Sequence, residues 1–241
     1  MTTLKLILAA GISAVALSSA AIAQDLVIAD APAGYAAGNF DGGFVGAFGG
    51  GMLAGVEFPT IGETLIPFDL DPEGWLLGVD AGFNFALGNG LVLGVVGDIA
   101  YADVTDSFGL GFSGISSNID WVGSVRARAG FDAGNFMPYL TAGIAAAHNT
   151  IEFSSISGEP GPDPVEPTTL SSDATHVGWT LGAGVEFAVA ESLSIDVGYR
   201  YNDYGAASYS MPFGGPDEPV ETSADLGLTS HQLTVGLHYG F

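Results

Sequence analysis

The sequence contains no cysteine, and its 241 residues include only four lysines and arginines against 27 aspartates and glutamates. Without cysteine the chain can form no disulfide, no thiolate zinc site and no cysteine nucleophile. The formal net charge of −23 argues against a nucleic-acid partner, because phosphate binding needs clustered Lys and Arg. A disordered acidic chain is also excluded, since 48% of the residues are hydrophobic and only 13% are charged.

The first 23 residues have the pattern of a cleavable signal peptide. Lys5 supplies the positive charge, residues 6–17 the apolar segment, and residues 21–23 the small-x-small cleavage signal. An uncleaved anchor helix is the alternative, but the apolar run is shorter than the ~20 residues that span a bilayer. We therefore expect an exported protein with a signal peptide over 1–23, a lead over 24–39 and one domain over 40–241.

From residue 40 onward, apolar residues alternate with small or polar ones, the period of a β-strand with two different faces. Between Ile119 and Phe131, for example, the odd positions are mostly apolar while the even positions include Arg126 and Arg128. Helices are disfavoured because glycine is frequent and no run of 18 apolar residues follows the leader. The expected strands cover 40–56, 74–87, 91–102, 119–131, 136–151, 174–188, 193–204 and 229–241.

The connections between these segments alternate in length. Residues 88–90, 132–135 and 189–192 are tight turns, whereas 57–73, 103–118, 152–173 and 203–228 are long and hold ten of the twelve prolines. Proline cannot donate to a strand ladder, so these stretches are predicted to be loops. The pattern predicts an all-β fold, an eight-stranded antiparallel transmembrane up-and-down β-barrel. We expect the long loops outside the cell and both mature termini in the periplasm.

The aromatic residues of the expected strands gather at two heights, as in the interfacial girdles of a bilayer-embedded barrel. A soluble barrel with its aromatics turned inward is the alternative, but it would have to hide its apolar face. The girdle on the loop side comprises Trp75, Tyr101, Trp121, Trp179 and Tyr201. The girdle on the turn side comprises Phe85, Phe131, Phe187, Tyr239 and Phe241.

The same alternation places the charged residues of the strands inside the barrel. A lipid-facing Arg at the bilayer midplane would cost ~2–4 kcal/mol, whereas paired charges can persist in the interior. We expect an Arg–carboxylate network that plugs the lumen; the alternative is that the charges line a narrow wet pore. The inward positions are Asp80, Asn84, Asp98, Arg126, Arg128, Glu186, Asp196 and Arg200.

Three motifs invite catalytic or binding interpretations, and each is outweighed. The G-x-G-x-x-G at 109–114 lacks the strand–turn–helix context of a dinucleotide site, and the calcium-like run at 69–74 contains Pro72. His148, His176 and His231 near the loop-side rim could serve a hydrolase, but without a nucleophile motif we interpret them as solvated. We therefore expect no enzyme, no catalytic residue, no cofactor and no metal site.

Nearly all of the mature chain, and most strongly the part from Trp121 onward, resembles the small porin-like outer-membrane β-barrel family of Gram-negative bacteria, which is related to the opacity proteins and to the barrel of outer-membrane protein A. The resemblance rests on residues 123–131, 137–144, 178–187 and 196–204. The ending His231–Phe241 resembles the signal read by the barrel-assembly machinery, with Tyr239 and Phe241 as its aromatic residues. The resemblance implies an eight-stranded barrel but no single biochemical activity.

These observations predict a monomeric cell-envelope protein of the outer membrane with a structural or surface role. Its expected partners are outer-membrane lipid, lipopolysaccharide and the barrel-assembly machinery during biogenesis. A narrow channel for small solutes and an outer-membrane hydrolase are the alternatives. The long loops hold 17 acidic residues and no Lys or Arg, which favours a solvated, repelling face over one that recruits divalent cations or basic partners.

Overall fold

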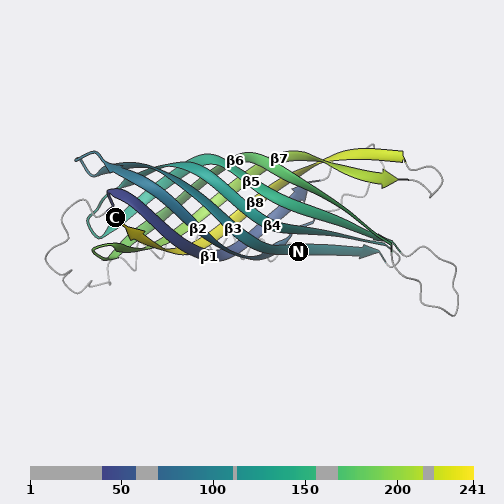
Figure 1. Cartoon of the computed structure of the whole chain (residues 1–241), viewed down its shortest axis with the longest axis horizontal. Helices are drawn as coiled ribbons and strands as arrows, with labels where there is room; N and C mark the ends of the chain where they lie inside the picture. The colour runs from purple at the N-terminus through teal and green to yellow at the C-terminus, as the bar shows by residue number, and fades with distance from the viewer. Residues whose placement is uncertain (1–39, 58–69, 111–112, 156–167, 214–219) are drawn as a thin grey trace, which may run out of the picture. The chain divides into compact units, whose positions relative to one another are not determined.

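A computed structural model describes residues 40–57, 70–110, 113–155, 168–213 and 220–241. The expected signal peptide (1–23) and the lead up to residue 39 lie outside these described residues. Within them the chain forms eight antiparallel strands that close into one barrel, with each strand paired to its neighbours in sequence and β1 paired to β8 (Figure 1). The predicted eight-stranded antiparallel barrel is confirmed. Among these residues no helix is long and apolar enough to cross a membrane.

The strands vary from 14 to 23 residues in length. They are β1 (Gly42–Glu57), β2 (Glu73–Ala86), β3 (Leu91–Leu110), β4 (Ser113–Phe131), β5 (Phe136–Ser155), β6 (Thr168–Ala190), β7 (Leu193–Phe213) and β8 (Val220–Gly240). The end of the barrel that carries the three tight turns is called the turn side below, and the other end the loop side.

The outer face of the barrel is apolar, as a lipid-exposed surface requires. Large side chains from all parts of the ring point outward, including Leu77, Val125, Leu140 and Val177, each at least 60% exposed. Closure of the ring pairs β1 with β8 from Phe44↔Gly240 to Glu57↔Gly227, so neither strand leaves an open edge. A closed ladder is the condition for strands to survive in hydrocarbon, where unpaired backbone groups cost several kcal/mol each.

The strands on the loop side are longer than the alternation predicted, which corrects the expected loops. Most of 103–118 belongs to β3 and β4, and parts of 152–173 and 203–228 belong to β5, β6, β7 and β8. Even Pro212 lies within β7, where it is paired with Glu221. A proline placed near the end of a strand removes only its own donor.

Irregularities in the hydrogen-bonded ladder explain why the period-two pattern of the sequence ends before strands β4 and β7 reach their loop-side ends. The register shifts between Ile119 and Trp121 in β4, and again between Asp203 and Ala206 in β7. Such a bulge reverses the faces: in β4 the buried positions change from even, such as Val122, to odd, such as Ile119. The period-two pattern therefore breaks at each bulge although the strand continues.

Candidate functional site

The interior of the barrel is filled with side chains in layers. Charged residues lie in the half nearer the turn side, apolar residues and tyrosines lie beyond them, and a small polar network follows towards the loop side. An eight-stranded barrel is just wide enough for such filling. The lumen is therefore the place where the chain's chemistry is concentrated.

Asp98 on β3 joins two arginines from different strands. Its carboxylate lies 2.7 Å from Nη2 of Arg126 on β4 and 3.0 Å from Nη1 of Arg200 on β7, and Ser124 donates a further hydrogen bond. The Asp98 side chain is only 2% exposed. Charge-assisted bonds of this kind compensate for the desolvation of the buried ions.

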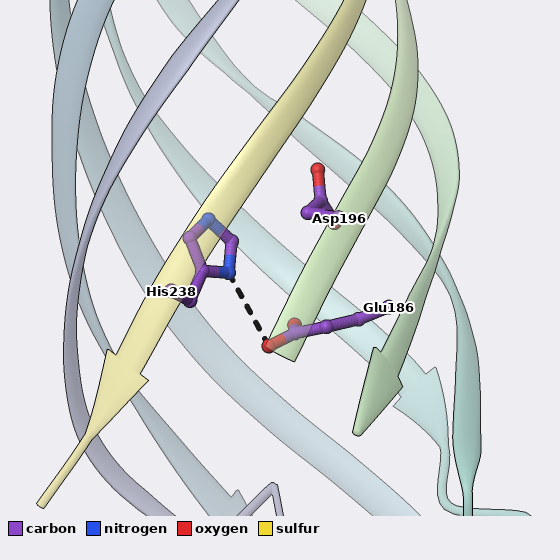
Figure 2. A group of neighbouring side chains, drawn as sticks. All are labelled: Glu186, Asp196 and His238. Carbon is purple, nitrogen blue, oxygen red and sulfur yellow. Dashed lines mark hydrogen bonds and ion pairs between the residues drawn. The ribbon is translucent and has the colours of Figure 1, made fainter. Parts of the chain in front are cut away.

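A second cluster surrounds Glu186 on β6. Nη2 of Arg128 lies 2.6 Å from Oε2 of Glu186 and 3.7 Å from Asp196 on β7, and its guanidinium stacks 3.8 Å from the centroid of the Tyr139 ring. His238 on β8 lies between two carboxylates: Nδ1 is 3.2 Å from Glu186 and Nε2 is 3.1 Å from Asp80. Figure 2 shows Glu186, Asp196 and His238 converging inside the barrel from three consecutive strands.

All three arginines thus point into the lumen and are less than 10% exposed. Sequence reasoning counted three arginines against four carboxylates and missed His238 as a further basic partner. The even position number of His238 could have identified it, because it shares the inward face of β8 with the buried Thr234 and Gln232. Asn84, also expected inside, is 3% exposed.

Space within the charged layer is limited. A cavity of about 30 Å³ lies among Asp80, Asp196, Arg128 and His238, which is room for about one water molecule. A larger cavity of about 230 Å³ lies at the turn-side mouth, lined in part by Phe40, Glu186 and His238. Several buried polar atoms have no hydrogen-bond partner within the described residues, among them Asp80 Oδ1, Arg128 Nε and Asp196 Oδ2.

An apolar layer follows the charged layer towards the loop side. It includes Met52, Leu76, Ile119 and Leu228, each at most 1% exposed, and the buried ring of Tyr204. Gln232 and Ser230 donate to the Tyr204 hydroxyl at 3.3 Å, so the only polar atom of that ring is satisfied. Sequence reasoning foresaw an ionic lumen and missed this hydrophobic core.

Beyond the apolar layer, His176 belongs to a buried polar network. Its Nε2 lies 2.7 Å from the hydroxyl of Tyr209, its Nδ1 is 3.2 Å from the carbonyl of Gly205, and Asn149 donates to Tyr209 at 3.1 Å. His176 is only 1% exposed, so its interpretation as a solvated rim histidine was wrong. Burial holds the pKa of His176 below its usual range and raises the pKa of Tyr209 to about 12.

The other two rim histidines lie on or near the surface. His231 is exposed, with Nδ1 2.7 Å from the hydroxyl of Tyr199, and His148 is half-buried against the ring of Trp121. His148 also lies near Thr175 and Asp173, at 3.3 Å and 4.0 Å. The 4.0 Å between His148 and Asp173 is too long for a hydrogen bond, so the carboxylate does not orient the imidazole as in a hydrolase. A hydrolase also needs free N–H donors for the oxyanion, and strand N–H groups are engaged in the ladder.

The expected girdle residues lie on the outer face of the barrel. Trp75 packs against Tyr101 and Trp179 against Tyr201 on the loop side, with ring centroids 5.8 and 5.5 Å apart. Trp121 is also exposed there. On the turn side the predicted girdle rings are exposed as well: Phe85, Phe131, Phe187, Tyr239 and Phe241.

The glycine motif at 109–114 and the calcium-like run at 69–74 both lie partly outside the described residues. Gly109 and Gly114 pair across the β3–β4 hairpin, and residues 111–112 between them lie outside the described residues. Asp69 of the calcium-like run also lies outside them, while Asp80 faces the lumen. On the loop side, Asp106, Asp120 and Glu152 surround a hollow of about 640 Å³, where Asn118 and Thr150 donate to Asp120.

The chain matches the family model for the outer membrane protein beta-barrel domain over residues 7–241. The 31 kDa outer-membrane immunogenic protein of Brucella melitensis biotype 1 is 29% identical over 255 residues, which cover 99% of this chain and 100% of that protein. The 25 kDa outer-membrane immunogenic protein of Brucella abortus biovar 1 is 30% identical over 203 residues, covering 84% and 80%. Among solved structures, the attachment invasion locus protein Ail of Yersinia pestis aligns with a TM-score of 0.41 at 18% identity, covering 83% and 99%.

Proposed function

The chain belongs to the family of outer membrane protein β-barrel domains, and from this premise we propose that it is a structural, surface-exposed component of the cell envelope with a closed lumen. The observation that carries the proposal is the filling of the interior. The Asp98 and Glu186 clusters are followed by an apolar layer around Met52, Leu76 and Tyr204, and the cavity in the charged layer is about 30 Å³. Ions or solutes would have to cross both layers.

The proposed orientation places the loop side outside the cell and the two mature termini in the periplasm. It follows the usual arrangement of such barrels, in which short turns face the periplasm and longer connections face outward. The relatives named as immunogenic outer-membrane proteins support an exposed surface. We further propose that the leader over 1–23 is cleaved on export.

The proposed partners are the lipids around the barrel, including lipopolysaccharide, and the assembly machinery that inserts it. The two aromatic belts suit the two interfaces of a bilayer. Tyr239 and Phe241, 56% and 78% exposed at the end of β8, are available to a recognition factor. A ring without a free strand edge also needs no second copy to satisfy its backbone, which supports a monomer.

The proposed role is not enzymatic. The relatives carry no activity in their names, and the rim histidines His148 and His231 form no hydrogen-bonded hydroxyl–His–carboxylate triad in the described residues. The runner-up is a narrow channel, which is favoured by the 230 Å³ cavity at the turn-side mouth and by the mixed charges of the lumen.

Conductance across planar lipid bilayers tests the proposal. The folded protein should give no steady current above the lipid background, whereas a large porin run under the same conditions should give regular steps. Stable steps from this barrel, proportional to salt concentration, would replace the closed structural role with the channel.

A further inference from the structure

The ring of His238 is held between two groups that can only accept hydrogen bonds. Nε2 lies 3.1 Å from Oδ2 of Asp80 and Nδ1 lies 3.2 Å from Oε1 of Glu186. A neutral imidazole has a single N–H, so it can serve only one of the two carboxylates. The other side of the ring needs a second proton or a metal cation between nitrogen and oxygen.

We propose that the turn-side half of the lumen binds a divalent transition-metal ion of the zinc class, with His238, Glu186 and Asp196 as its ligands. One ligand atom from each of the three residues lies within 4.8 Å of the others (Figure 2). Imidazole and carboxylates are ligands that zinc accepts, and the His ligand disfavours calcium or magnesium. The site goes beyond the envelope role and does not depend on whether the lumen conducts.

Asp80 would act as the outer partner of the ligand histidine. A metal-bound histidine usually donates its other ring N–H to a carboxylate, which fixes its tautomer and orientation. The Asp80–Nε2 contact has this geometry and leaves Nδ1 directed towards Glu186. Gly46 on β1 makes the arrangement possible, because a Cβ there would clash with both the His238 ring and the Asp80 carboxylate.

Buried carboxylate oxygens that lack a hydrogen-bond partner favour a metal over a proton. Asp196 Oδ2 and Asp80 Oδ1 are buried without a hydrogen-bond partner, and the Asp80 side chain is only 9% exposed. Both residues line the 30 Å³ cavity beside His238. A proton on Nδ1 of His238 would provide a hydrogen bond to Glu186 but none to Asp196. A single metal ion can bind both carboxylates.

Arg128 is the competing cation, and its position is compatible with the site. Its guanidinium contacts Oε2 of Glu186 at 2.6 Å, so Oε1 remains directed towards His238. It lies farther from Asp196, at 3.7 Å. Three carboxylates, Asp80, Glu186 and Asp196, face this single arginine, so the cluster keeps room for further positive charge.

A metal ion would enter from the turn side. The 230 Å³ cavity at that mouth is lined by Glu186 and His238, whereas the apolar layer around Leu76 and Tyr204 separates the site from the loop side. Asp41 and Glu186 line this cavity, and their negative charge raises the local concentration of cations at the mouth.

Isothermal titration of the untagged, folded protein in detergent micelles with zinc chloride tests the proposal. We expect one saturable Zn²⁺ per barrel. Asp196→Asn and His238→Gln should abolish binding, and Asp80→Asn should weaken it by roughly 10- to 100-fold. Matched controls on exposed loop-side residues, His231→Gln and Glu152→Gln, should leave it unchanged.

Two outcomes would overturn the site: no saturable binding, or binding that survives Asp196→Asn and His238→Gln but is lost in His231→Gln. A gel-mobility assay of the folded barrel shows whether each variant has assembled. If the His238 variant does not fold, ¹⁵N NMR of the histidine rings in the unmodified protein replaces it: Zn²⁺ must shift the His238 nitrogens and spare those of His231. Conductance measured on the same samples tests the envelope role separately.

Discussion

Asp98 shows how much of the lumen depends on one residue. Its two carboxylate oxygens are divided between Arg126 and Arg200, and within the described residues no other carboxylate forms an ion pair with either guanidinium. Asp98 and Arg126 come from the neighbouring strands β3 and β4, whereas Arg200 comes from β7, so the cluster also connects strands that are not adjacent in the barrel. Removing the carboxylate would leave two buried cations facing each other.

Asp98→Asn should therefore lower the free energy of unfolding by about 3–5 kcal/mol, the cost typical of breaking a buried ion pair from one side. Urea unfolding in lipid vesicles, followed by tryptophan fluorescence, measures the change. Asp103→Asn on the same strand, where the side chain is exposed, should change stability by less than about 0.5 kcal/mol. Equal losses in the two variants would contradict the role of the cluster.

His176 makes the loop-side extension of the barrel sensitive to acid. Burial holds the pKa of His176 below its usual value, so the unfolded or opened state binds the proton more tightly. Its contribution to stability is complete above the ordinary histidine pKa of about 6.5 and is lost as pH falls below that value. Tyr209, with a pKa of about 12, remains protonated and keeps donating throughout.

We expect the backbone amides around Gly205 and Tyr209 to be less protected from hydrogen exchange in mild acid than at neutral pH. Hydrogen exchange at several pH values, corrected for the intrinsic rates, measures this opening. The effect should disappear in His176→Gln, which cannot titrate, and persist in His148→Gln, which changes a half-buried histidine outside the network. Persistence in both variants would assign the acid response elsewhere.

At the scale of the strands, period-two alternation was sufficient to locate all eight elements. It failed where the backbone departs from the regular ladder. In β7 the buried positions change from even, at Asn202 and Tyr204, to odd, at Tyr209, across the bulge that contains Gly205 in a positive-φ conformation. A pattern that reverses its phase resembles the end of a strand, so the bulges hid the extensions of β4 and β7, and Pro212 also marked the extension of β7 as a loop.

The outward face of a strand should tolerate charge according to its depth in the bilayer. Val125 lies near the middle of the spanning part of β4 and is 62% exposed, whereas Phe131 lies at the turn-side belt. Val125→Arg should cost ~2–4 kcal/mol of folding free energy in lipid vesicles, and Phe131→Arg at most ~1 kcal/mol from its charge. Similar costs at both positions would contradict the proposed placement of the belts.

For the whole molecule, sequence parity located the charged lumen residues because a strand's faces follow directly from odd and even positions. Odd and even positions do not predict contacts between strands that are distant in the sequence. The pairing of His238 with Asp80 spans 158 positions, and the apolar layer joins Met52, Leu76 and Tyr204 from β1, β2 and β7. Such groupings depend on the stagger of the closed ring, which no single segment encodes.

The apolar layer, rather than the ion pairs, should set the conductance of the barrel. Leu76 and Tyr204 are each 1% exposed within it, and the double substitution Leu76→Ala with Tyr204→Ala would remove their side chains without changing the charges. We expect this variant to give ion currents in planar bilayers that the unmodified barrel lacks, at a cost of several kcal/mol in stability. The outward neighbours supply the matched control, because Leu77→Ala with Tyr201→Ala removes equal volume from the outer face and should leave the barrel closed. If the inner double variant folds and still carries no current, the Asp98 and Glu186 clusters close the lumen by themselves.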